Sequence, residues 1–292
     1  MKKTRSGQRS RRRAAAVPSA GHACQEKIFF PAPDGTRLCG ILHRPAAASR
    51  SGVLLCHGMM SSKDGDKHRL LAEMLVRRGH WVLRFDFAGR GESGGDFLAL
   101  SITRQAGEAG AALRILKARG LERVGVEGSS LGGAAAIRLA SQGGVDALVT
   151  WAAVGRADRL AEGMAGREGM EQWRREGVRR VDGQDVGFSL IEDARRQDLL
   201  AAAARVRCHW LIVHGARDEV VPCSDAEDLY RAAGGPAGGR VSLEILPEAD
   251  HQFTAPGDRR RLLDLSADFF QRQLGRAARP ARSGTRPGKE VA

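Results

Sequence analysis

The sequence has few of the features that mark disulfide-rich, metal-binding or membrane proteins. Its 292 residues include five cysteines, an odd number, widely spaced and without a CxxC pair. Neither a disulfide framework nor a zinc site is therefore expected. Aromatic residues make up only 5% of the chain, and no apolar run is long enough to span a bilayer. The apolar stretch after Arg13 breaks at Pro18, too early for an export signal, so we expect a cytoplasmic protein.

Acidic residues are absent from residues 1–23, which carry seven Lys and Arg, and residues 274–292 have a net charge of +4. These two ends hold 11 of the 13 net positive charges, which leaves the body at +2. Both ends are poor in large apolar residues, and we predict disordered basic tails over 1–23 and 275–292. Any affinity for nucleic acid or a membrane surface would belong to the tails, so no such partner is expected for the body.

The remaining residues, 24–274, are enough for one domain with a sizeable core. Short apolar runs alternate with helical patterns; the runs are 53–56, 81–85, 124–126, 147–151, 210–213 and 241–246. This alternation predicts an α/β fold with a mostly parallel sheet and helices on both faces. Residues 26–45, with a "PDGT" turn between two apolar segments, predict an antiparallel hairpin at one sheet edge. The alternation fails over about 155–205, which we interpret as a cap insertion above the sheet.

Two adjacent serines stand in the segment "VGVEGSSLGGAA" at residues 124–135, between an apolar run and a helical pattern. The pattern Gly-x-Ser-x-Gly fits only the frame from Gly128 to Gly132, which makes Ser130 the candidate nucleophile rather than Ser129. Such a serine lies on a tight strand-to-helix turn, where a Cβ at either glycine would collide with neighbouring backbone. The alternative is a Gly-rich turn with an N-capping serine.

A nucleophilic serine needs a base, and three of the eight histidines follow Ser130 in the chain. In this architecture the acid follows the nucleophile and the histidine comes last. His209 and His214 flank an apolar run, where packing or hydrogen bonding is the usual role. His251 lies in "PEADHQF", a loop between the last expected strand and the last expected helix, and is the predicted base.

The acid that orients His251 is predicted to be Asp218, in the loop after the apolar run of "LIVHGARDEVVP". Glu219 is its nearest rival, and Asp158, after the preceding expected strand, is a weaker one. Asp250 is adjacent to His251 and is expected to point elsewhere. A turn-forming role is the alternative for Asp218.

An oxyanion hole needs two backbone donors aimed at the developing charge. The N–H of Leu131, which follows the nucleophile, is one candidate, and the N–H of Met59 in "LLCHGMMSS" is the other. His57 in that loop is expected to be a structural hydrogen-bonding residue. Asp86 and Arg90, in "RFDFAGRGES", are expected to serve a turn that shapes the pocket floor.

Five segments together resemble the α/β-hydrolase superfamily in order and spacing over about residues 26–274: "CHGMMSSKD", "RFDFAGRGESGG", "GSSLGGAAAIRLA", "HGARDEVVP" and "EADHQF". Within it, the chain resembles bacterial serine aminopeptidase-type and feruloyl or cinnamoyl esterase-like hydrolases. The resemblance implies the α/β-hydrolase fold, a Ser-Asp-His triad, no cofactor and no metal, and an acyl or aryl group bound beneath the cap. Met59 replaces the aromatic residue often found after the His-Gly pair, so the resemblance does not predict the shape of the acyl pocket.

The candidate triad and oxyanion hole together predict a serine hydrolase that cleaves a carboxylic ester through an acyl-enzyme. The expected binding partner is a small ester or acyl substrate. Peptide, amide and thioester cleavage use the same groups, so an aminopeptidase, an amidase or a thioesterase remains an alternative. A noncatalytic binding protein with the same fold is a further alternative, and loss of a triad member would mark it. Residues of the cap such as Met164 and Trp173 could line the pocket or pack its helices, and the oligomeric state is open.

Overall fold

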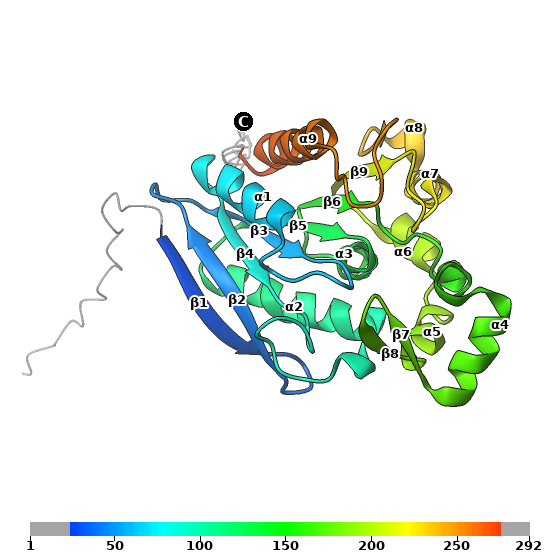
Figure 1. The fold of residues 1–292 in the computed structure, drawn as a ribbon. Coiled ribbons are helices and arrows are strands. Elements are labelled where there is room, and N and C mark those ends of the chain that lie inside the picture. The colour runs from blue at the N-terminus through cyan, green and yellow to red at the C-terminus, as the bar shows by residue number, and fades with distance from the viewer. Residues whose placement is uncertain (1–23, 276–292) are drawn as a thin grey trace, which may run out of the picture.

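The structure is a computed structural model that describes residues 24–275, without the side chains of residues 161–163, 167 and 236. The expected tails, Gly275 apart, lie outside the described residues. An eight-stranded sheet with the order β1-β2-β4-β3-β5-β6-β9-β10 forms the centre (Figure 1). Its strands are β1 (Cys24–Pro31), β2 (Arg37–Arg44), β3 (Ser51–Cys56), β4 (Trp81–Phe85), β5 (Arg123–Ser129), β6 (Ala147–Trp151), β9 (His209–Gly215) and β10 (Val241–Leu246).

The sheet is parallel except at one edge. There β2 pairs antiparallel with both β1 and β4, and β1 with β2 forms the expected hairpin. All the pairs from β4 to β10 are parallel, as alternating strands and helices predict. The loops that follow these parallel strands therefore meet at one edge of the sheet, where ligands of open α/β sheets bind.

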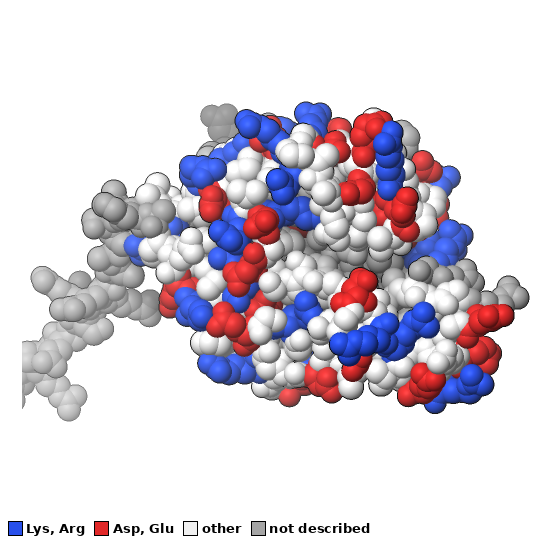
Figure 2. Space-filling view, in the orientation of Figure 1, with Lys and Arg blue, Asp and Glu red and all other residues white. Residues whose placement is uncertain are grey.

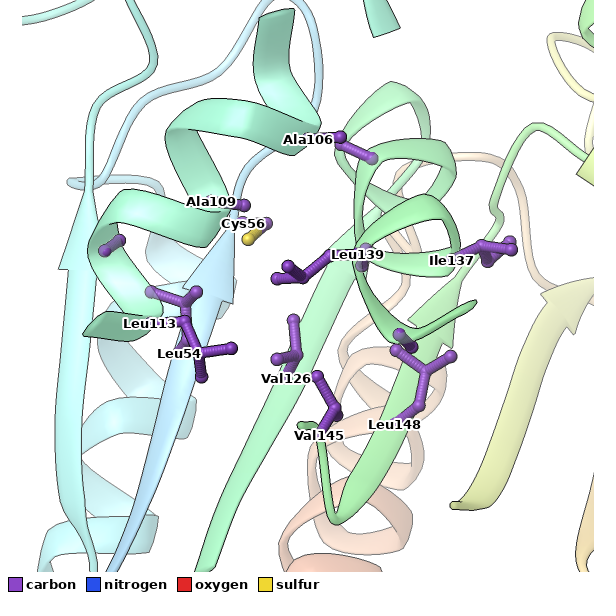
Figure 3. Close-up of a cluster of buried hydrophobic side chains, with 14 of the residues drawn as sticks. Leu54, Cys56, Ala106, Ala109, Leu113, Val126, Ile137, Leu139, Val145 and Leu148 are labelled. Atoms are coloured by element: carbon purple, nitrogen blue, oxygen red, sulfur yellow. The ribbon is translucent and has the colours of Figure 1, made fainter. Parts of the chain in front are cut away.

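Helices cover both faces of the sheet. Helices α1 (Asp66–Arg77) and α9 (Pro256–Leu274) pack on one face, and the other is covered by α2 (Ile102–Ala118), α3 (Leu131–Ser141), α6 (Leu199–Arg205) and α7 (Cys223–Ala232). Figure 3 shows Leu54 of β3 and Val126 of β5 close to side chains of α2 and α3. Val53 and Leu55 belong to the apolar cluster on the opposite face, since successive side chains of a strand alternate.

The segment 155–205 contributes no strand to the main sheet. It holds η2 (Ala157–Arg159), α4 (Leu160–Glu176), a separate hairpin of β7 (Val178–Val181) and β8 (Gln184–Gly187), and α5 (Ser189–Ala194). Trp173 and Phe188 pack their rings edge to face, and the indole N–H donates to the Val186 carbonyl. Helix α6 differs, because Ala202 and Ala203 belong to the core of the body. The part of the insertion that lies outside the core of the body thus ends near α5, at the lower right of Figure 1.

Two connecting elements complete the chain: η1 (Phe97–Ala99) before α2 and α8 (Gly235–Gly238) before β10. Among residues 24–275, no helix combines the length and the apolar character needed to cross a bilayer. On the face seen in Figure 2, basic and acidic side chains alternate, and neither sign covers that face alone.

Candidate active site

Ser130 occupies a sharp turn between β5 and α3. Its backbone has φ 53° and ψ −119°, a left-handed conformation that is costly for a residue with a side chain. A Cβ on Gly128 would overlap the Gly132 carbonyl, and a Cβ on Gly132 would overlap the His57 carbonyl. Both glycines of the Gly-x-Ser-x-Gly pattern are therefore required by close backbone approach. Ser130 precedes α3 but makes no side-chain cap to it, which argues against the N-cap interpretation.

The three residues predicted to act together lie in one hydrogen-bonded chain. His251 Nε2 is 3.2 Å from Ser130 Oγ, and His251 Nδ1 is 2.7 Å from Asp218 Oδ2. Ser130 follows β5, Asp218 follows β9, and His251 lies between β10 and α9. These segments are far apart in sequence and meet because parallel strands present their carboxyl ends at one edge.

None of the rival carboxylates contacts His251 in the described part of the chain. Glu219 is exposed and has no contact with His251. Asp158 lies in the cap, where it is 3.3 Å from Nε of Arg156. Asp250 accepts the Thr254 N–H at 2.9 Å, so it points away from the imidazole beside it. The geometry therefore favours Asp218 as the partner of His251.

Both carboxylate oxygens of Asp218 lie close to hydrogen-bond donors. Its Oδ1 accepts the N–H groups of Val220 and Val221 at 2.9 and 2.8 Å, and its Oδ2 lies 3.1 Å from His214 Nε2 as well as against His251. Burial alone would raise the pKa of Asp218, but the contacts with His214, His251 and Val221 hold that pKa well below its ordinary value of 3.8. The carboxylate stays ionised over the range in which an imidazole titrates.

His214 is a residue of the site to which sequence analysis gave only a general role in packing or hydrogen bonding, without a link to Asp218. It is fully buried at the end of β9, and its Nε2 is 2.9 Å from the Val221 carbonyl. A carbonyl can only accept, so Nε2 carries the proton. The signal available in the sequence was its position four residues before Asp218 in "HGARD".

Lys67 of α1 forms a hydrogen bond with the loop that contains His251. Its Nζ donates to the Gln252 carbonyl at 2.9 Å and lies 5.4 Å from the centroid of the Phe253 ring. Burial lowers the pKa of Lys67. Helix α1 thereby restrains the backbone next to the imidazole.

The loop after β3 lies against Ser130. Gly58 approaches it so closely that a Cβ there would be 3.3 Å from Ser130 Cβ, and Met59 and Leu131 line the same cavity as Ser130. His57 accepts the Phe87 N–H at 3.0 Å through Nε2 and donates from Nδ1 to the Gly58 carbonyl. Burial lowers the pKa of His57 to about 4. These contacts make His57 a neutral, structural residue of this loop.

A buried ion pair anchors the far end of this loop. Lys63 Nζ, 2% exposed, donates to Asp86 Oδ2 at 2.9 Å and also contacts Asp64 and Glu92. Burial alone would lower the pKa of Lys63, but these hydrogen bonds raise it above its ordinary value. Asp86 additionally accepts the backbone N–H of Glu92, which is the turn role expected from the sequence, and that of Lys63, a contact with the loop after β3 that the sequence did not predict.

Ser130 opens into a cavity of about 310 Å³. Its lining is mostly apolar, with four ionic side chains, and comprises Met59, Ser130, Leu131, Val154, Arg156, Arg159, Leu160, Met164, Glu219, Val220, Val221, Pro222 and Asp225. Of the cap residues whose role was open, Met164 lines this cavity while Trp173 is buried in the cap. Across the described residues, no group of three or more His, Cys, Asp or Glu is arranged to hold a metal ion.

The chain is similar to known hydrolases in sequence and fold. A family model described as the prolyl oligopeptidase family matches residues 68–277. The palmitoyl-protein thioesterase ABHD10 of Bos taurus is 28% identical over 230 residues, which cover 72% of this chain and 71% of the relative.

Two solved structures have the same fold. A putative hydrolase of Agrobacterium vitis S4 has a TM-score of 0.73 at 24% identity and covers 85% of this chain and 99% of its own. The esterase Est1E of Butyrivibrio proteoclasticus with bound ferulic acid has a TM-score of 0.75 at 18% identity, with coverage of 85% and 100%.

Proposed function

Because the chain belongs to the prolyl oligopeptidase family and has the α/β-hydrolase fold, we propose that this serine hydrolase cleaves carboxylic esters through Ser130, His251 and Asp218. The observation that carries the proposal is the hydrogen-bonded chain from Ser130 to Asp218, which opens into a mostly apolar cavity. A hydroxyl becomes a competent nucleophile only when a base can take its proton, and the imidazole of His251 is within reach, with Nε2 3.2 Å from Ser130 Oγ. The apolar lining suits the hydrocarbon part of an acyl group.

The reaction follows from these positions. Ser130 Oγ attacks the ester carbonyl while His251 Nε2 takes the hydroxyl proton, and Asp218 stabilises the imidazolium through the Nδ1–H. The N–H groups of Met59 and Leu131 are the proposed donors to the oxyanion. His251 then gives its proton to the leaving alcohol, which departs and leaves Ser130 acylated. Water, deprotonated by His251, attacks the acyl-enzyme; His251 then returns this proton to Ser130 Oγ as the bond to the acyl group breaks and the free acid leaves.

A thioester is the second candidate substrate. The bovine relative is named as a palmitoyl-protein thioesterase, and cleavage of a thioester needs the same three side chains. The cavity volume of about 310 Å³ is at the small end for ligand pockets, which favours an acyl group shorter than a palmitoyl chain.

A substrate panel tests the proposal. It comprises p-nitrophenyl esters of increasing acyl length, a feruloyl ester, an acyl thioester and an aminoacyl anilide, assayed with wild type, Ser130→Ala and the neighbouring Ser129→Ala. We expect the Ser130 variant to lose about 10⁴-fold or more in kcat, and Ser129→Ala to retain most activity. A fluorophosphonate probe should label wild type and Ser129→Ala. Persistent labelling of Ser130→Ala would exclude Ser130 as the nucleophile, and a wild-type protein inactive on the whole panel would favour a binding function.

A further inference from the structure

The first turn of α1 contacts the supports of both Ser130 and His251. Lys67 Nζ donates to the carbonyl of Gln252, the residue that follows His251. The next residue, His68, lies against β5 and β6, the strands beside the Ser130 turn. One helical turn is therefore connected to the segment of the nucleophile and to the segment of the base.

His68 fixes this turn of α1 to the sheet. It is 3% exposed, its Nε2 lies 3.0 Å from Glu127 Oε2, and its ring stacks on that of Trp151 with the centroids 5.5 Å apart. Glu127 belongs to β5, which leads into Ser130. The Trp151 carbonyl accepts the Ser130 N–H at 2.8 Å. The position of the helix is thus set by the same backbone that holds the nucleophile.

The turn directly after His251 is strained. Phe253 has φ 52°, a left-handed conformation that is unfavourable for a residue with a bulky side chain. Its ring is fully buried, and its N–H donates to the Asp250 carbonyl at 3.2 Å. Lys67 contacts this turn twice, because its Nζ is 2.9 Å from the Gln252 carbonyl and 5.4 Å from the centroid of the Phe253 ring. Loss of both contacts would leave the turn free to relax, and His251 would move with it.

Both contacts of Lys67 are of kinds that a cation makes well. Burial lowers the pKa of Lys67, whereas the charges of Glu127 and Asp250 act in the opposite direction and favour its protonated form. An ammonium group has three donors, and its charge is attracted to the face of an aromatic ring. Arginine shares both properties, while methionine has neither.

We propose that Lys67 is a positioning residue of the reaction, which holds His251 Nε2 within hydrogen-bonding distance of Ser130 Oγ from a helix that His68 anchors. The inference rests on the proposed ester hydrolysis by Ser130 and His251. A displacement of about 1 Å at reacting groups costs on the order of 100-fold in rate. Lys67 does not line the cavity, so its loss should slow the chemical step and leave substrate binding nearly unchanged.

Three substitutions in this turn test the role of Lys67. Lys67→Met keeps an unbranched side chain but removes the charge and the donors, and it should lower kcat by about 10- to 100-fold with KM within about twofold of wild type. Lys67→Arg should recover most of the loss. The matched control is Arg69→Met, because Arg69 is exposed and pairs only with Asp66, at 3.9 Å. Thermal unfolding establishes that all the variants are folded.

A His251→Ala background separates positioning of the imidazole from a general structural effect. Without an imidazole to position, the addition of Lys67→Met should change the residual rate by less than about twofold. The same fold loss in both backgrounds would overturn the inference, because Lys67 would then act without His251. Wild-type kcat in Lys67→Met would overturn it as well.

Failure of the proposed function gives a different result, in which wild type cleaves no ester of the panel. In that case the rate at which a fluorophosphonate labels Ser130 still measures how well His251 activates the serine. Slower labelling of Lys67→Met than of Arg69→Met supports the positioning role. Equal labelling of these two variants contradicts it.

Discussion

His214 Nε2 lies 3.1 Å from Asp218 Oδ2, and both side chains are fully buried. The same nitrogen donates to the Val221 carbonyl, while the N–H groups of Val220 and Val221 are bonded to Asp218 Oδ1. His214, Asp218 and the loop between them thus form a closed set of contacts at the end of β9. This set fixes the carboxylate that faces His251, and it also positions Val221 on the cavity wall.

Removal of the His214 donor should impair the chemical step more than binding. We expect His214→Leu to lower kcat by about 100-fold with a smaller change in KM, because Asp218 and hence His251 would shift from their positions. His214→Gln, whose amide can still donate to Val221, should recover most of that loss. His209→Gln, at the exposed start of the same strand, is the control. Equal activity of the Leu and Gln variants would show that the hydrogen bond has no positioning role.

The arrangement of Ser130, Asp218 and His251 could be anticipated because its signals are local. Each residue lies in a short segment whose turn chemistry is readable, and the order of the segments fixes which strand end they occupy. The parallel sheet was predictable for the same reason, since β4, β6 and β10 coincide with the mainly apolar runs expected at 81–85, 147–151 and 241–246. What these signals do not contain is the set of contacts between segments.

The misses arise where a polar residue is buried by a partner far away in the chain. Glu127 of β5 is fully buried, and its Oε2 lies 3.0 Å from Nε2 of His68 in α1, a contact that the sequence did not predict. Two other buried polar contacts join residues of different segments or turns in the same way: His214 contacts Asp218, and Lys63 contacts Asp86. The hairpin of β7 and β8 escaped notice because its sequences, VRRV and QDVG, are short and contain charged residues in place of an apolar run.

The identity of the triad acid can be tested by isosteric amides. Asp218→Asn should lower kcat by about 10³- to 10⁴-fold, because an amide cannot stabilise the imidazolium of His251 or hold its tautomer. Glu219→Gln and Asp158→Asn should have small effects, since neither side chain contacts His251. The measurement is kcat and KM on the best ester of the panel. A severe loss in Asp158→Asn together with a mild one in Asp218→Asn would mean that the acid comes from the loop after β6.

The buried Lys63–Asp86 pair should matter for stability. Lys63→Met leaves Asp86, 0% exposed, without its cation and should lower the free energy of unfolding by about 3–5 kcal/mol. Lys27→Met is the control, because Lys27 forms only an exposed contact with Glu92 and its loss should be small. Urea unfolding of the three proteins measures the difference. Similar midpoints for both variants would show that Asp86 is stabilised by its backbone donors alone.

Glu108 of α2 should make stability depend on pH. It is 1% exposed, accepts the Ala88 N–H at 3.0 Å and lies 3.0 Å from Nε of Arg104. Burial raises the pKa of Glu108 from its ordinary value of 4.5 to about 7, more than these two contacts lower it.

The folded state therefore keeps the Glu108 proton over a range in which the unfolded chain has lost it. The stability that this group contributes is complete below pH 4.5 and is lost as pH rises towards 7. Glu108→Gln can still accept the Ala88 N–H but cannot titrate. Relative to this variant, wild type should lose about 3 kcal/mol of unfolding free energy between these two pH values and little beyond them. Urea unfolding at a series of pH values measures the difference, with Glu73→Gln as the control, because the Glu73 side chain lies on the exposed face of α1. Parallel curves for wild type and Glu108→Gln would mean that Arg104 keeps the buried carboxylate ionised.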